Sequence, residues 1–242
     1  MPKPERQYFK DGQSWWMFRD YIERSSRFVD WTLALEDIKH ECLGRVSPVE
    51  VGTRLYRARL LPPPKVRPGS THGSLAPLDM WPPSAERAVG NRLNPQGIPY
   101  LYLARAPQTA VAELRPWRTA ELTVAEFAVT ARIQLFDFVG VPEEPRAETF
   151  LLRKLSEMFA MPSHAESQFD YAATQFVSEY LKHVGKGAVA GIQYPSSLDE
   201  GGVNVALFGD ASRPFEKLVS CGELQDWTVS RVKVESARVS RE

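Results

Sequence analysis

The sequence has only two cysteines, Cys42 and Cys221, and they stand far apart among its 242 residues. Such a pair forms no disulfide framework, so a reducing compartment is expected. No apolar run approaches the roughly 18 residues that a membrane-spanning helix needs, and the first residues contain no apolar segment typical of a secretory signal. We therefore expect no membrane partner and a location in the bacterial cytoplasm, or delivery into a target cytoplasm without a signal peptide.

An excess of either charge is also missing, because 30 Lys and Arg residues balance 30 Asp and Glu residues. A nucleic-acid-binding protein needs a positive field to displace counterions, so this balance argues against a direct nucleic-acid partner. The four histidines and two cysteines lack metal-ligand spacing, and the sequence contains neither a phosphate-binding glycine loop nor a serine-hydrolase elbow. No metal and no resident cofactor are expected.

Apolar residues make up 43% of the chain and charged residues 25%, which is typical of a folded protein. Apolar residues at helical spacing predict one or two amphipathic helices between residues 14 and 44. We expect residues 1–50 to form an N-terminal helical extension and residues 51–242 to form the main domain. The aromatic residues of the extension predict a docking face, on the main domain or on a partner: Trp15, Trp16, Phe18, Tyr21, Phe28 and Trp31.

The main domain mixes strand and helix patterns. Strands are predicted at 53–60, 99–104, 187–194, 203–208 and 218–232, and residues 122–138 form either one long strand or two. Helices are predicted at 147–161 and 170–184 by apolar residues three and four apart. The proline-rich stretch 61–89 is too irregular for a regular element, and long loops of this kind often serve as lids or binding loops.

Residues 90–117 combine a turn, a strand, a second turn and the start of a helix. Asn94 belongs to the first turn, and Pro107 predicts the helix start, with Gln108 or Thr109 near its cap. Glu113 would then lie early in this helix among apolar neighbours, where an unpaired carboxylate is costly. Either it forms an ion pair with Arg92 that braces strand and helix, or it faces a ligand that is cationic or carries hydroxyl groups.

In the strand at 53–60, Arg57 alternates onto the same face as Leu55, where a buried guanidinium needs a partner. The alternative is an edge strand with solvated arginines. Two arginines, Arg57 and Arg92, suit a pyrophosphate, and a carboxylate such as Glu113 can stabilise an oxocarbenium-like sugar. With Tyr102 and Ser196 added, the set suits a dinucleotide that is cleaved at a glycosidic bond.

Three segments resemble the RES domain, a family named for an arginine, a glutamate and a serine: LYRAR at 55–59, GNRLNPQGIPYLYLARAPQTAVAELRPW at 90–117, and GIQYPSSLDEGGVNVALF at 191–208. The resemblance spans roughly residues 51–215. It implies an α+β fold similar to that of ADP-ribosyltransferases, with a mixed β-sheet core flanked by helices. Several RES proteins are toxins that degrade NAD by hydrolysis or phosphorolysis.

The resemblance also implies the roles of individual residues. It assigns catalysis to Glu113, Arg57 and Ser196. It assigns substrate binding to a second set, in which Ser197 is an alternative for the serine: Arg92, Tyr102, Tyr56, Asn94, Ser197 and Asn204. The sequence departs from the family pattern at Asn91, where a small residue usually precedes the arginine, and in its proline-rich insertion and N-terminal helices.

For function, the resemblance implies an NAD glycohydrolase or phosphorylase that acts as a toxin or defence effector. NAD is the implied substrate, and inorganic phosphate is a potential co-substrate. An antitoxin or immunity protein that covers the active site is the implied partner, and a homo-oligomer is left open. Two alternatives stay open as well: transfer of ADP-ribose to a macromolecule, and a non-catalytic interaction module with the RES fold.

Overall fold

The computed structural model describes residues 7–61, 75–142, 149–161, 171–209 and 214–232. Its centre is an eight-stranded mixed sheet in the order β1-β5-β6-β7-β3-β2-β4-β8. The strands are β1 Val46–Val49, β2 Arg54–Leu60, β3 Leu101–Ala104, β4 Glu121–Val129, β5 Ile133–Asp137, β6 Val189–Pro195, β7 Val203–Leu207 and β8 Val219–Thr228. The helices are α1 Gly12–Arg24, α2 Thr32–Leu43, α3 Pro107–Ala112, α4 Phe150–Ala160 and α5 Ala172–Val184. The predicted α+β class, with a helical N-terminus, is confirmed.

The two faces of the sheet carry separate cores because side chains alternate along each strand. On β7, Ala206 belongs to the cluster that also contains residues of α4 and α5, such as Phe159 and Val177. Its neighbours Val205 and Leu207 belong to the cluster of the opposite face. That second cluster includes residues from the short 3₁₀ helices η1 Pro77–Met80 and η5 Phe215–Lys217. A further 3₁₀ helix, η2, spans Ala85–Arg87.

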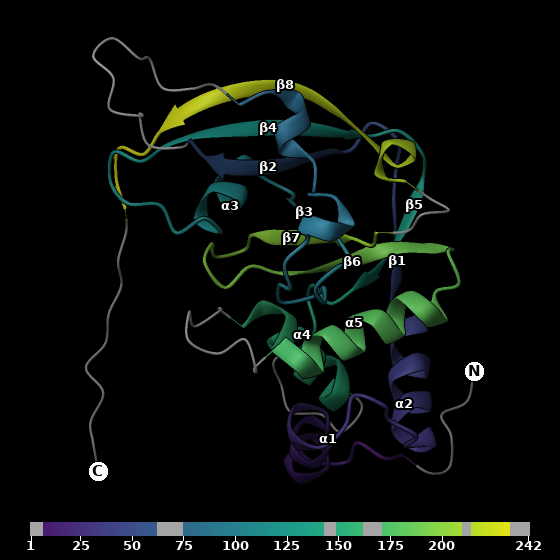
Figure 1. Ribbon diagram of the computed structural model, residues 1–242. Coiled ribbons are helices and arrows are strands. Elements are labelled where there is room, and N and C mark those ends of the chain that lie inside the picture. The colour runs from purple at the N-terminus through teal and green to yellow at the C-terminus, as the bar shows by residue number, and fades with distance from the viewer. Residues whose placement is uncertain (1–6, 62–74, 143–148, 162–170, 210–213, 233–242) are drawn as a thin grey trace, which may run out of the picture.

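The sheet is nearly divided between β2 and β3. These strands pair at a single position, Tyr56 with Ala104, whereas β2 pairs with β4 along all seven of its residues. We call this the seam. It separates a half-sheet of β1, β5, β6, β7 and β3 from one of β2, β4 and β8, which occupies the upper part of Figure 1. Helix α3 lies against the small half, and α4 and α5 cover the large half (Figure 1).

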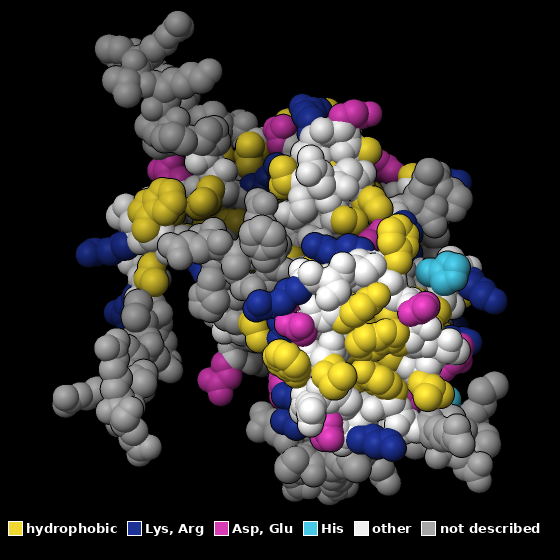
Figure 2. Space-filling model, turned by 60° about the horizontal axis from the view of Figure 1, so that its bottom comes forward, with side chains coloured by type: hydrophobic (Ala, Val, Ile, Leu, Met, Phe, Trp, Pro, Cys, Tyr) yellow, Lys and Arg dark blue, Asp and Glu magenta, His cyan; other side chains and the backbone are white. Residues whose placement is uncertain are grey.

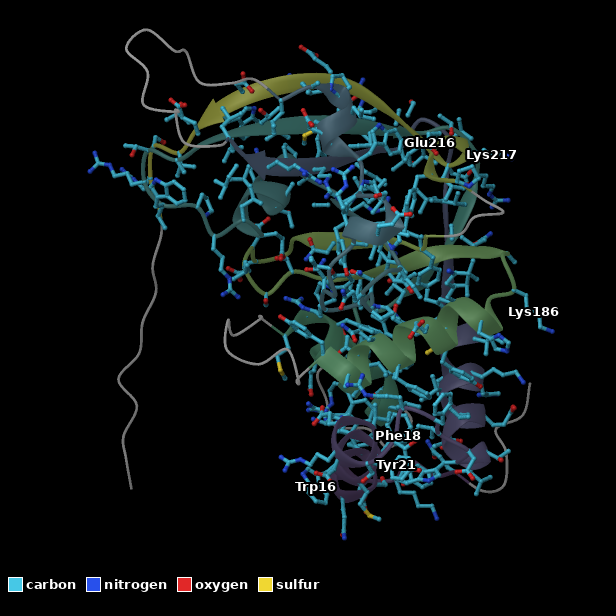
Figure 3. The ribbon with its side chains drawn as sticks, viewed as in Figure 1. Trp16, Phe18, Tyr21, Lys186, Glu216 and Lys217 are labelled. Carbon is cyan, nitrogen blue, oxygen red and sulfur yellow. The ribbon has the colours of Figure 1, made fainter. Side chains whose placement is uncertain are left out.

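The N-terminal helices share the core of the large half-sheet. Trp15 and Phe18 of α1 are buried in the same cluster as residues of α5. Of the other aromatic residues predicted as a docking face, Tyr21 and Trp31 pack against each other in a tilted arrangement, with ring centroids 4.8 Å apart. Trp16 points outward from α1 (Figure 3), with 63% of its surface exposed. Figure 2 brings this side forward and shows hydrophobic side chains gathered on it.

Several element boundaries differ from the predictions. β1 was not predicted, and it places Val46–Val49 in the sheet, within the residues assigned to the helical extension. The boundary after residue 50 stays a prediction. Residues 122–138 contain two strands, β4 and β5, and the N-terminal segment contains two helices. The proline-rich residues 62–74, residues 147–148 and residue 170 lie outside the described part of the chain. Within that part, no helix is both long and apolar enough to cross a bilayer.

Helix α3 begins at Pro107 as predicted, but Ala106 with an extended backbone is its N-cap, in place of Gln108 or Thr109. It ends after six residues, so Glu113 lies at its C-cap and not early in the helix. The backbone N–H of Arg115 donates to the carbonyl of Ala112 at 2.9 Å, and Arg115 has a positive φ of 47°. This tightened last turn ends the helix and leaves the Glu113 side chain beyond its last regular residue.

Candidate functional site

A cleft of about 350 Å³ lies over the seam, where β2 and β3 part. Four residues that line it are successive partners across neighbouring strands: Tyr194 of β6 is opposite Asn204 of β7, Asn204 is opposite Ala104 of β3, and Ala104 is opposite Tyr56 of β2. Residues directly opposite each other project from the same face of a sheet. We call these four residues the cross-strand row, and they connect the two half-sheets beneath the cleft.

Glu113 enters the cleft from the end of α3 with one of its carboxylate oxygens held in place. Its Oε1 accepts a hydrogen bond from Ser196 Oγ at 2.7 Å and another from Asn204 Nδ2 at 2.6 Å. Ser196 Oγ itself accepts from the backbone N–H of Leu198 at 3.1 Å, which fixes the direction of its hydroxyl. Oε2 receives no hydrogen bond from the residues that the structure describes. The carboxylate is therefore oriented by two donors and has one oxygen left for a ligand.

Arg57 brings a positive charge to the seam. Its Nη1 donates to the carbonyl of Tyr102 on β3 at 3.1 Å, and its buried Nε has no partner among the described residues. The pKa of Arg57 is lowered to about 10, mainly by burial and secondly by the nearby charge of Arg59, while Tyr102 opposes the shift. No ion pair involves Arg57 in the described part of the chain, so its charge is not neutralised there. The predicted need for a partner is met only by a backbone carbonyl.

Arg92 lines the same cleft from the turn before β3. Its Nη1 donates to the carbonyl of Phe159, at the end of α4, at 2.7 Å, and its Nε is also buried without a partner among the described residues. The ion pair between Arg92 and Glu113, one of the two alternatives for this carboxylate, is not formed: Glu113 bonds Ser196 and Asn204 instead. Two guanidinium groups without a carboxylate partner thus line one cleft with a carboxylate that has a free oxygen, an arrangement that suits an anionic ligand carrying hydroxyl groups.

Tyr102 and Asn94 are placed together, with their polar groups directed into the turn. The Tyr102 hydroxyl donates to Asn94 Oδ1 at 2.8 Å and accepts from the Leu93 N–H at 3.2 Å. Asn94 Nδ2 donates to the carbonyls of Val89 and Pro95, both at 3.1 Å. Burial raises the pKa of Tyr102 well above its usual range. Tyr102 lines the cleft with its ring. The buried Asn94 does not line the cleft, but it shapes the turn that carries Arg92.

The loop that carries Ser196 connects β6 to β7 and is tied to α3. Thr109 Oγ1 donates to Asp199 Oδ2 at 2.5 Å, and Thr109 is fully buried. A Cβ atom at Gly202 would lie 2.8 Å from both of these oxygens, so the close approach requires glycine. Ser197 is exposed on the same loop and does not line the cleft. The geometry therefore favours Ser196 over Ser197 as the serine of the site.

Besides several aliphatic residues, sequence reasoning did not assign to the site three residues with polar groups that line the cleft: Asn91, Tyr171 and Tyr194. Tyr194 is 4% exposed and ends an almost wholly buried strand, where an aromatic residue is normally part of the core. The informative signal was its position opposite Asn204, which depends on strand register and not on composition. In the described ranges, no three His, Cys, Asp or Glu side chains lie together as metal ligands would.

A family model described as RES domain matches residues 55–231 of this chain. The matched span runs from β2 to beyond the end of β8 and includes every residue that lines the cleft. A search of curated proteins found no match to the chain.

Proposed function

The chain belongs to the RES domain family, and we propose that it is an enzyme that cleaves NAD at the nicotinamide glycosidic bond. The observation that carries this proposal is the state of Glu113, whose Oε1 is fixed by Ser196 and Asn204 while Oε2 has no donor among the described residues. A carboxylate held in this way matches the developing positive charge of a sugar that loses its leaving group. NAD acts as a substrate, without a resident cofactor.

The arginines supply the anion-binding half of the site. Arg57 and Arg92 bind the pyrophosphate of NAD through guanidinium groups that have no carboxylate partner among the described residues. Tyr102 and Tyr56 offer ring faces to the flat or sugar parts of the substrate. The substrate is thereby oriented with its nicotinamide ribose toward Glu113.

In the reaction, the bond between the anomeric carbon and the nicotinamide nitrogen breaks, and its electron pair stays with nicotinamide, which leaves as a neutral molecule. Glu113 Oε2 accepts a hydrogen bond from a ribose hydroxyl and stabilises the cationic sugar. Water or phosphate then attacks the anomeric carbon; water gives ADP-ribose and releases a proton to solvent. Ser196 contacts Glu113, so we assign it a positioning role in place of the catalytic role that the family resemblance implies.

Replacing Glu113 by glutamine tests this proposal. Glu113→Gln keeps the size of the side chain and removes its charge, so NAD consumption should fall on the order of a hundredfold or more, with the melting temperature largely kept. Loss of NAD is followed with and without phosphate, by chromatography that separates ADP-ribose from its phosphorylated form. Glu36→Gln, an exposed change on α2, is the control. Turnover near that of the wild type in Glu113→Gln would exclude the role assigned to Glu113.

We further propose that the protein is a toxin or defence effector whose cleft is covered by an antitoxin or immunity protein. Wild-type protein expressed in bacteria should then lower cellular NAD and slow growth, and Glu113→Gln should do neither. Incubation with NAD labelled in its adenylate part distinguishes the products: label in free ADP-ribose supports cleavage, and label on a macromolecule supports ADP-ribose transfer. Normal growth despite NAD depletion would contradict the proposed toxin role. It would leave the proposed cleavage of NAD standing.

A further inference from the structure

Tyr194 lines the candidate site, yet no part of the family resemblance assigns it a role. It ends the buried run of β6, is 4% exposed, and lines the cleft together with Arg92 and Glu113. Its position in the cross-strand row fixes its direction. Because it is directly opposite Asn204, whose amide holds Glu113, its side chain leaves the sheet on the face from which Asn204 reaches the carboxylate.

The Tyr194 hydroxyl makes no hydrogen bond to any residue in the described part of the chain. Buried tyrosine hydroxyls usually have a partner, because burial without one costs free energy. Two other tyrosines of this face follow the rule: the half-buried Tyr102 bonds Asn94 and Leu93, and the buried Tyr100 accepts a long hydrogen bond from Ser178 at 3.4 Å. Tyr194 differs from both in having its hydroxyl available.

The surroundings of Tyr194 indicate how its hydroxyl is used. Burial raises its pKa, Arg92 opposes that shift, and Glu113 adds to it, so the phenol keeps its proton at any working pH. A phenol that keeps its proton can donate a hydrogen bond to an oxygen of a ligand. The two charged groups that influence it are the ones to which we assign the phosphate and the ribose of NAD. Between these two parts, NAD has only the sugar–phosphate linkage.

We propose that Tyr194 is a substrate-binding residue whose hydroxyl donates a hydrogen bond to the sugar–phosphate linkage on the nicotinamide side of NAD. This inference rests on the proposed function, since the identity of the ligand comes from it. The contact involves the part of NAD that remains in ADP-ribose, so Tyr194 binds substrate and product alike. Its loss should therefore weaken binding and leave the chemical step nearly unchanged.

Tyr194→Phe tests the proposal, because it removes the hydroxyl and keeps the ring that packs near Phe159, with centroids 6.4 Å apart. Loss of a hydrogen bond to a charged partner should raise KM for NAD by about tenfold, and kcat should change by less than about threefold. The inhibition constant of ADP-ribose should rise by a similar factor. Steady-state kinetics measure all three, and circular dichroism verifies the fold.

The matched control is Tyr100→Phe, which removes a buried hydroxyl from the same core at a position away from the cleft. It should leave KM, kcat and ADP-ribose inhibition within about twofold of the wild type. Wild-type values of KM and of the inhibition constant in Tyr194→Phe would overturn the role of Tyr194 and leave the proposed function standing. A large loss of kcat at unchanged KM would overturn it too. Wild-type protein that neither binds nor consumes NAD would overturn both proposals.

Discussion

At the scale of single residues, Arg57 shows how the site works against the stability of the fold. Burial is the largest cause that lowers its pKa from the ordinary value of arginine to about 10. A base whose pKa is lower in the folded state binds its proton more weakly there than in the unfolded chain. Its charge therefore costs stability at every pH below about 10, and the cost disappears as the pH rises from about 10 toward the higher pKa of arginine in the unfolded chain. The protein keeps this charge in a place where a neutral side chain would be more stable.

Arg57→Met should separate function from stability. The methionine fills similar space without charge, so we expect the free energy of unfolding at pH 7.5 to rise by about 1 kcal/mol, after allowance for the lost bond to the Tyr102 carbonyl. The kcat/KM for NAD should fall by at least about a hundredfold. Urea denaturation and NAD consumption measure the two effects. A variant that is both less stable and fully active would contradict this account of Arg57.

At the scale of elements, α3 acts as one support for two points of the loop between β6 and β7. Thr109 and Glu113 are four positions apart and therefore project from the same side of the helix. Thr109 bonds Asp199 and Glu113 bonds Ser196, so the helix holds the loop at its first residue and at its middle. The carboxylate that we place at the reacting sugar and the loop that orients it are thus fixed to the same short helix.

Thr109→Val should show whether this support matters for catalysis. Valine has the shape of threonine without the hydroxyl, so Asp199 loses its partner and the loop gains freedom. We expect kcat to fall by about tenfold while the melting temperature falls by only a few degrees, since one hydrogen bond contributes about 1 kcal/mol. Thr109→Ser, which restores the hydroxyl, should recover most of the kcat. Equal rates in Thr109→Val and the wild type would mean that the Ser196 contact alone positions the loop.

The elements also show what sequence patterns can predict here. The apolar spacing of α5 and the alternation of β2 were visible because each covers several periods. β1 was missed because it has four residues, one of them Pro48, and shows no full alternation. The end of α3 was missed because its last turn closes through local backbone bonds before Pro116 is reached.

The candidate site was predictable to the extent that the family resemblance marked its residues, and Arg57, Arg92, Tyr102, Glu113 and Asn204 do line one cleft. The spacing of these residues in the sequence could not predict which of them form hydrogen bonds with each other. The preference of Glu113 for Ser196 and Asn204 over Arg92 depends on strand register and on where α3 stops. The same dependence on register explains why a tyrosine at the end of a buried strand was not recognised.

At the scale of the whole molecule, the N-terminal helices pack into the same hydrophobic core as residues of the candidate site. Phe18 is fully buried, with ring centroids 5.2 Å from Phe9 and 6.1 Å from Phe176 of α5. The Asp37 carboxylate of α2 accepts the backbone N–H groups of Tyr8 at 2.6 Å and Phe9 at 3.1 Å, which fixes the segment before α1. These contacts make α1 and α2 part of the packing that supports α5.

Phe18→Ala should therefore destabilise the whole protein. Removal of a fully buried phenylalanine typically costs about 3–5 kcal/mol, and we expect a single cooperative unfolding transition shifted to lower urea. Trp16→Ala, which changes an exposed side chain of the same helix, should shift the free energy of unfolding by less than about 1 kcal/mol. Two separate transitions, with only the first moved by Phe18→Ala, would instead show that residues 1–50 fold as a unit of their own.

At the seam, a contact between the two half-sheets is made by a side chain and not by a backbone group. If the strands paired along their full length, the Tyr102 carbonyl would accept a hydrogen bond from a backbone N–H group. Only a substitution by proline removes such a donor. Here it accepts the guanidinium of Arg57, which any missense change at that codon removes. This contact between the two half-sheets therefore depends on one side chain, and a single substitution at Arg57 is enough to remove it.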